Sequence, residues 1–152
     1  MSDKKMLIIY GTETGNSELL AMDAEKLAND LEFDVTVNGM DEITLSDIQD
    51  NGNVLIVCST WGDGEQPDNA IDLYESVEGS DDASMSGVGF AVLALGDTAF
   101  DLFCEAGIQW DNILQEKGGN RISERIDCDV DYEDDAEAWI EDTLNRFKET
   151  WK

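Results

Sequence analysis

Three unbroken apolar runs constrain the fold of this chain more than any other feature. They lie within the strands expected at residues 5–10, Asn53–Ser59 and Val88–Leu95. Such runs are typical of strands in a parallel sheet that helices cover on both faces. Weaker strand patterns occur at Phe33–Val37 and Arg121–Ile126, and stretches with helical spacing separate the strands. The alternation predicts an α/β fold: a doubly wound five-stranded parallel sheet with helices on both faces.

The intervening segments carry apolar residues at helical spacing. With 152 residues and 41% apolar composition, the chain is expected to form a single domain over residues 1–152. The apolar residues are Leu20, Ala24, Leu27, Ala28 and Leu31 on one face of the first helix, Ile71, Tyr74 and Val77 in a short helix, Ala106, Trp110, Ile113 and Leu114 on one face of a third, and Ala136, Trp139, Ile140, Phe147 and Trp151 as the expected buried stripe of the last.

Ligands of open parallel sheets bind at the carboxyl ends of the strands, where the strand order reverses. This rule selects three segments: the first loop (11–17), the second loop (60–67) and the third loop (96–104). We expect these three loops to form one ligand site.

The first loop has the composition of a phosphate site. It joins a strand to a helix N-terminus, where backbone N–H groups and the helix dipole favour an anion. Hydroxyl donors and a side-chain amide add to these groups, since the loop contains Thr12, Thr14, Gly15, Asn16 and Ser17. A capped turn without a ligand is the alternative for this motif taken alone.

The second and third loops each place an aromatic residue near the sheet edge. Trp61 is followed by Gly62 and Gly64, and Phe100 lies in the third loop. Two aromatic side chains from separate loops can enclose a planar ring, with a stacking contribution of roughly 0.5–1.5 kcal/mol each. Either residue alone could instead be a packing residue, and Phe103 could belong to the core.

Composition excludes several classes of function. The chain has no histidine, so a histidine base or a histidine-ligated zinc site is excluded. Its net charge is −27, and no Lys or Arg occurs between Lys26 and Lys117. This charge disfavours nucleic acid and anionic membrane and favours a basic partner protein, or reflects solubility or a saline cytoplasm. Three cysteines without a C-x-x-C pair indicate reduced thiols, and therefore a cytoplasmic protein.

These motifs resemble those of the flavodoxin family over the whole chain. Gly11–Glu18 is similar to the family's FMN-phosphate loop, and Ser59–Gly64 and Gly96–Cys104 resemble its two ring-binding loops. The stretch from Ser59 to Asn69 also resembles the FMN domains of sulfite reductase and nitric-oxide synthase. The chain length resembles that of short-chain flavodoxins. Many members have tyrosine where this chain has Phe100.

The resemblance implies FMN as the cofactor, with a role for each loop. The first loop would bind the phosphate, Trp61 and Phe100 would lie on opposite faces of the ring, and residues at the strand ends would line the pyrimidine end and the ribityl chain. The expected cofactor-binding residues are Thr12, Glu13, Thr14, Gly15, Asn16, Ser17, Ser59, Thr60, Trp61, Gly62, Asp63, Gly64, Leu95, Gly96, Asp97, Phe100, Phe103 and Cys104.

The expected function is that of a low-potential one-electron carrier rather than an enzyme. It would be a monomer that exchanges electrons with a reductase and an acceptor enzyme through their basic surfaces. An alternative is a small FMN-dependent flavin or quinone reductase. The chain lacks the phosphorylated aspartate position of response regulators, the lysine of the P-loop and the glycine pattern of dinucleotide sites.

Overall fold

The computed structural model describes residues 5–11, 16–59, 66–96, 104–129 and 133–149. Its described strands are all parallel: β1 (Lys5–Gly11), β2 (Asp34–Gly39), β3 (Asn53–Ser59), β4 (Gly89–Leu95), β5 (Asn120–Arg121) and β6 (Ile126–Cys128). The strand order is β2-β1-β3-β4-β5, and β6 pairs with β4. The order reverses between β1 and β3, which confirms the predicted doubly wound sheet.

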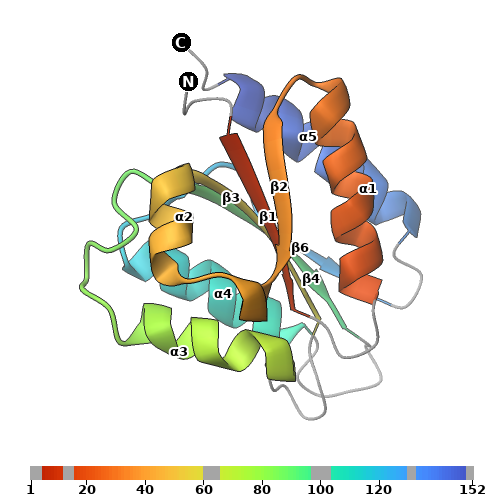
Figure 1. Ribbon diagram of the computed structural model, residues 1–152. Coiled ribbons are helices and arrows are strands. Elements are labelled where there is room, and N and C mark those ends of the chain that lie inside the picture. Colours follow the sequence, from red (N-terminus) through yellow and green to blue (C-terminus); the bar gives the residue numbers. More distant parts are fainter. Residues whose placement is uncertain (1–4, 12–15, 60–65, 97–103, 130–132, 150–152) are drawn as a thin grey trace.

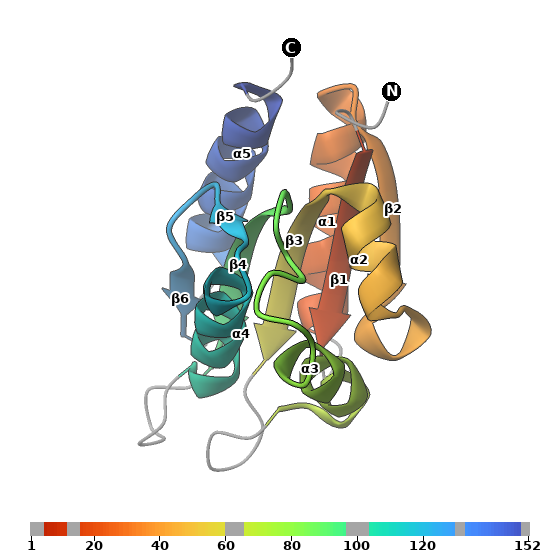
Figure 2. The same cartoon turned by 90° about the vertical axis from the view of Figure 1, so that its left-hand side faces the viewer.

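Helices cover both faces of this sheet (Figures 1 and 2). One face is covered by α1 (Asn16–Asp30) and α5 (Glu133–Glu149). The other is covered by α2 (Leu45–Asn51), α3 (Ile71–Glu78) and α4 (Glu105–Glu116). Short 3-10 turns at Met40–Glu42 and Asp68–Ala70 complete the described elements.

Each face of the sheet has its own apolar core. The core under α1 and α5 includes Leu20, Ala24, Ala28, Ala136, Ile140 and Phe147, and the core under α2, α3 and α4 includes Ile48, Val77, Ala106, Trp110 and Leu114. The central strands β3 and β4 contribute to both cores. Strands buried on both faces need apolar side chains at every position, which is why their sequences show no alternation.

The fifth strand differs from its expected form. The sequence predicts one strand over Arg121–Ile126, whereas the structure has β5 and β6 with a break between them. Arg121 pairs with Phe90 of β4 and Ile126 pairs with Leu93, so five steps on this strand oppose three steps on β4. Two extra residues therefore bulge out of the ladder, which interrupts the strand.

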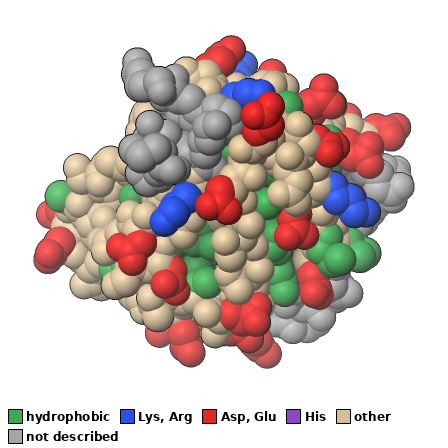
Figure 3. Space-filling view, turned by 45° about the horizontal axis from the view of Figure 1, so that its top comes forward, with side chains coloured by type: hydrophobic (Ala, Val, Ile, Leu, Met, Phe, Trp, Pro, Cys, Tyr) green, Lys and Arg blue, Asp and Glu red, His purple; other side chains and the backbone are tan. Residues whose placement is uncertain are grey.

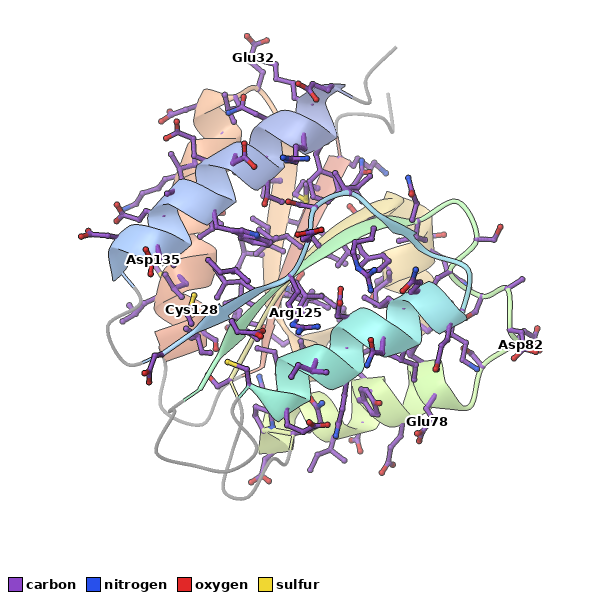
Figure 4. The ribbon with its side chains drawn as sticks, turned by 180° about the vertical axis from the view of Figure 1, so that it is seen from behind. Glu32, Glu78, Asp82, Arg125, Cys128 and Asp135 are labelled. Atoms are coloured by element: carbon purple, nitrogen blue, oxygen red, sulfur yellow. The ribbon has the colours of Figure 1, made fainter. Side chains whose placement is uncertain are left out.

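A buried carboxylate holds this bulged segment to α4. Asp111, only 4% exposed, accepts hydrogen bonds from Arg121 Nε at 2.9 Å and from Arg125 Nη1 at 3.1 Å. Arg125 Nε also donates to Asp127 at 2.7 Å. Figure 4 shows Arg125 on the segment that crosses between α4 and α5, with Cys128 further along it toward the carboxyl edge. These ion pairs thus hold in place the segment that leads into β6.

Helix α2 is an element that the sequence analysis did not predict. Its seven residues contribute only Ile48 as a fully buried side chain, so no apolar stripe marks it. The available signal was the capping box at its start, where Asp47 Oδ2 accepts a hydrogen bond from the N–H of Thr44 at 2.9 Å.

Candidate functional site

The first loop is flanked by a tightly packed strand end and a helix N-terminus. A Cβ at Gly11, the last residue of β1, would lie 3.1 Å from Ala70 Cβ, Cys58 Sγ and Met40 Sδ. The neighbouring Tyr10 carbonyl accepts a hydrogen bond from Asn69 Nδ2 at 3.2 Å. Glycine therefore allows the close packing that fixes the point where the chain leaves β1 for α1.

Two hydroxyl groups meet beside this helix start. Ser17, the second residue of α1, is fully buried, and its Oγ lies 2.6 Å from Oγ of Ser59, the last residue of β3. The sequence analysis expected Ser59 near the ring or the ribityl chain, and the contact joins it to the first loop as well. Hydroxyls can rotate to donate or accept, so the pair can redirect its protons toward an anion at the helix N-terminus.

The described basic residues nearest to this corner in the sequence lie far from it. Lys5 is at the opposite end of β1, about 20 Å from Gly11 at the usual strand rise. Lys26 is nine residues beyond Ser17 in α1, about 13 Å along the helix axis. Neither of these two ammonium groups would therefore contact an anion bound at this corner, where N–H and hydroxyl donors are present.

The two residues at the ends of the third loop, Gly96 and Cys104, lie directly against each other in the structure. Cys104 has a left-handed backbone (φ 58°) and caps α4, where its carbonyl accepts the N–H of Ile108 at 3.0 Å. A Cβ at Gly96 would lie 2.8 Å from the Cys104 nitrogen. Only glycine leaves room for the Cys104 backbone to approach Gly96 this closely.

The end of β6 contacts both of these residues. The Cys128 carbonyl accepts the N–H of Gly96 at 2.9 Å and the thiol of Cys104 at 3.6 Å. The segment held by Asp111 thus continues into a direct contact with the third loop. Leu95, which precedes Gly96, is buried at 5% exposure.

The cysteines at this edge are free, buried thiols. Burial raises the pKa of Cys58 far above its ordinary value, that of Cys104 to about 12 and that of Cys128 to about 11. Thiols that remain protonated at neutral pH are poor nucleophiles. Their contribution to the site is packing and weak hydrogen bonding.

Tyr10 stands at the same edge as the first loop. Its hydroxyl donates to Glu18 Oε2 at 3.4 Å. Partial burial, followed by the negative charge of Glu18, raises the pKa of Tyr10, so the phenol stays neutral at physiological pH.

The described residues include only part of the expected site. The structure brings together Ser17 and Ser59 at one corner and Leu95, Gly96 and Cys104 at the other, both at the carboxyl edge of the sheet. Thr12, Glu13, Thr14, Gly15, Thr60, Trp61, Gly62, Asp63, Gly64, Asp97, Phe100 and Phe103, together with the side chain of Asn16, lie outside the described residues.

Sequence reasoning missed one polar residue at this edge. Gln66 is the first described residue of the second loop, and its side-chain amide contacts both β3 and α4. No motif in the sequence assigned it a role, and its partners on α4 are at least 40 positions away in the chain. No signal in the sequence could have indicated these contacts.

A separate groove of about 460 Å³ lies between α1 and α5. Its lining consists of Asp23, Lys26, Leu27, Asp134, Glu137, Ala138 and Glu141. Four carboxylates and one ammonium group make it unsuitable for a phosphorylated ligand, and its described lining has no aromatic side chain. The carboxyl edge is therefore the better candidate for the functional site.

The fold and the edge site define a class of protein, the α/β domains that hold a nucleotide-like ligand where the strand order reverses. The sequence profile of the flavodoxin family matches residues 8–139, so the chain belongs to the flavodoxin family. It is a short-chain flavodoxin similar to the FMN domain of sulfite reductase. Family membership implies FMN as its cofactor and a role in electron transfer.

Individual relatives agree with this assignment. The sulfite reductase [NADPH] flavoprotein alpha-component of Bacillus subtilis is 40% identical over 146 residues, which are 96% of this chain and 24% of that protein. The chain thus spans about a quarter of the length of the curated relatives it matches. Among solved structures, a flavodoxin from Streptococcus pneumoniae (TIGR4) matches with a TM-score of 0.87 and 26% identity over 97% of this chain and 99% of that one. Oxidised flavodoxin 2 from Bacillus cereus matches with a TM-score of 0.81 and 28% identity over 97% and 99%.

The described residues fit FMN chemically. The buried hydroxyl of Ser17 and the half-buried hydroxyl of Ser59, beside a helix N-terminus, suit a phosphate. Among the helices in the described ranges, none combines the length and the hydropathy needed to cross a membrane.

Proposed function

We propose that this chain is a one-electron carrier that binds FMN at the carboxyl edge of its sheet, with residues 1–152 acting as one FMN-binding domain. The observation that carries the proposal is the Ser17–Ser59 hydroxyl pair, which joins the first and second loops at a helix N-terminus. FMN supplies the redox chemistry when bound, and the chain binds it, orients it and limits its access to water.

Each loop has a distinct part in this proposal. The first loop, with Thr12, Glu13, Thr14, Gly15, Asn16 and Ser17, binds the phosphate through N–H and hydroxyl donors. Trp61 and Phe100 contact the two faces of the ring. The pyrimidine end and the ribityl chain lie along Ser59, Thr60, Leu95, Gly96, Asp97 and Cys104, and the cofactor site also includes Gly62, Asp63, Gly64 and Phe103.

The acidic surface supports electron exchange with partner proteins that have basic surfaces. Figure 3 shows acidic side chains spread over the face in view, with few basic ones among them. A net charge of −27 attracts a basic partner over long distances and accelerates encounter at low salt. We propose a reductase as electron donor and an enzyme as acceptor, with this chain acting as a monomer in a reducing compartment such as the cytoplasm.

A flavin or quinone reductase is the second candidate. It is favoured by one observation, the match to relatives that are named as components of an enzyme. Steady oxidation of NADPH by the purified chain with FMN alone would favour this candidate. A requirement for an added reductase would favour the carrier.

Binding of FMN and riboflavin tests the proposed site, because the two ligands differ by the phosphate. Thr14→Val should weaken FMN about tenfold, the effect of one lost charge-assisted hydrogen bond, and riboflavin by less than twofold. Calorimetric titration measures both affinities. The matched control is Thr36→Val on β2, where the residue is exposed. Equal weakening of both ligands by Thr14→Val would contradict the phosphate assignment.

A further inference from the structure

The side-chain amide of Gln66 has a partner for each of its hydrogen-bonding groups. Its Nε2 donates to the Ala106 carbonyl at 3.0 Å and to Gln109 Oε1 at 3.1 Å. Its Oε1 accepts from Trp110 Nε1 at 2.9 Å and from Cys58 Sγ at 3.6 Å. A glutamine amide has two donors and two acceptor sites, so its capacity is fully used.

The partners also fix which way the amide points. The indole of Trp110 can only donate, and the Ala106 carbonyl can only accept. The carboxamide of Gln109 is itself oriented, because its Nε2 donates to Glu105 Oε2 at 3.1 Å. The arrangement therefore allows one orientation of Gln66 and disfavours any side chain without both donors and acceptors.

The position of Gln66 in the chain determines which segments these contacts connect. Cys58 lies just before the second loop and Gln66 near the end of it, so their contact closes that loop at its base. The other contacts reach the first turns of α4, which begins directly after Cys104 at the end of the third loop. One side chain thus ties the base of the second loop to the helix that follows the third.

We propose that Gln66 is a positioning residue for the flavin ring, an inference that rests on the proposed function. It sets the distance between the described ends of the two ring-binding loops. Ser17 and Ser59 hold the phosphate corner through a separate contact. Loss of the Gln66 amide should therefore weaken binding of the ring and leave the contribution of the phosphate unchanged.

Because Trp110 is buried, loss of the Gln66 amide should be costly in free energy. The indole is fully buried, and its edge meets the Tyr74 ring at a centroid distance of 5.2 Å. Without Gln66 its N–H would have to remain unpaired or the start of α4 would have to shift. Either response changes the chain that follows Cys104.

The test compares Gln66→Met with Gln115→Met, which changes the same residue type at an exposed position of α4. Gln66→Met should raise the dissociation constants of FMN and riboflavin by the same factor, about tenfold, and Gln115→Met should leave both within about twofold. Gln66→Met should also decrease the difference between the two one-electron midpoint potentials of the bound FMN. In the cofactor-free protein it should speed amide hydrogen exchange at residues 105–110, whereas Gln115→Met should not.

Gln109→Leu removes a single partner of the Gln66 amide. This variant is the alternative test if Gln66→Met fails to fold. It should weaken both flavins about threefold. Unchanged affinities and potentials in either variant, with only a lower melting temperature, would assign Gln66 a purely structural role and overturn the inference. Weakening of FMN alone would also overturn it. Wild-type protein that binds neither flavin would overturn the proposed function as well, whereas wild-type binding with an unaffected Gln66→Met would overturn this inference only.

Discussion

The two corners of the candidate site are held together in different ways. The phosphate corner depends on one contact, in which Ser17 of α1 meets Ser59 of the central strand β3. The ring corner depends on several contacts, through Gln66, Asp111 and the bulged segment that ends at Cys128. Both residues of the first contact belong to motifs that the sequence shows, whereas Asp111 and the bulged segment belong to none.

Overpacking under the ring corner should have the largest effect on stability. A Cβ at Gly107 of α4 would lie 2.2 Å from Ala94 Cβ and 3.0 Å from Ala94 Cα on β4. Gly107→Ala should therefore lower the free energy of unfolding by about 3 kcal/mol, despite its higher helix propensity. Urea unfolding measures the change.

The control for this prediction is Gly79→Ala at the end of α3. Its added Cβ would meet only the Glu75 carbonyl, at an ordinary 3.4 Å. This control should change stability by less than about 0.5 kcal/mol. If Gly107→Ala had an equally small effect, α4 would not be packed as closely on β4 as the structure shows.

Removal of the charge at Asp111 should have the next largest effect. Asp111→Asn leaves two guanidinium groups without their shared carboxylate and should cost about 2 kcal/mol of unfolding free energy. The cost is below that of a fully buried pair, because the Arg121 and Arg125 side chains are 27% and 24% exposed. Urea unfolding at several salt concentrations measures it.

The exposed pair Arg146–Asp142 on α5 provides the comparison. Arg146→Gln should have a far smaller effect on the free energy of unfolding, and this effect should disappear at high salt. An Asp111→Asn variant as stable as Arg146→Gln would show that the bulged segment is held by other contacts.

Disruption of the phosphate corner should have a smaller effect on stability. Ser17→Ala and Ser59→Ala should each cost about 1 kcal/mol, and the double variant should cost less than the sum because the hydroxyls share one hydrogen bond. A double-mutant cycle in urea measures this coupling. Additive costs would mean that the 2.6 Å contact does not contribute to the fold.

The sequence could predict some of the elements that these variants probe and not others. β1, β3 and β4 follow from runs that must be apolar on both faces, and α1, α4 and α5 follow from their apolar stripes. The break between β5 and β6 could not be predicted, because it depends on the register against β4. Helix α2 has too few buried residues to show a stripe. Of the site, the motifs gave the edge and the loops, whereas Gln66 is defined by partners far away in the chain.

At neutral pH, the smallest effect on stability is expected from ionisation of the thiols at the ring corner. Burial raises the pKa of Cys104 to about 12 and that of Cys128 to about 11, from an ordinary value of 9.0. Their contribution to stability should be fully present below pH 9 and should be lost as the pH rises from 9 through 11 and 12, because only the unfolded chain ionises readily there.

Alkylation by iodoacetamide checks the same thiols at about pH 8. The three thiols should react at least about a hundredfold faster in urea than in the folded protein, since burial blocks access and suppresses the thiolate. Rapid alkylation of one cysteine in the folded state would show that this cysteine is accessible and that the packing at the ring corner is looser than described.

A potentiometric titration of the FMN-loaded protein tests the central proposal most directly. If both corners hold the cofactor and the chain is a one-electron carrier, the bound flavin should be reduced in two separate one-electron steps, with the second step at a lower potential than in free FMN. A single two-electron step at the potential of free FMN would contradict the proposal.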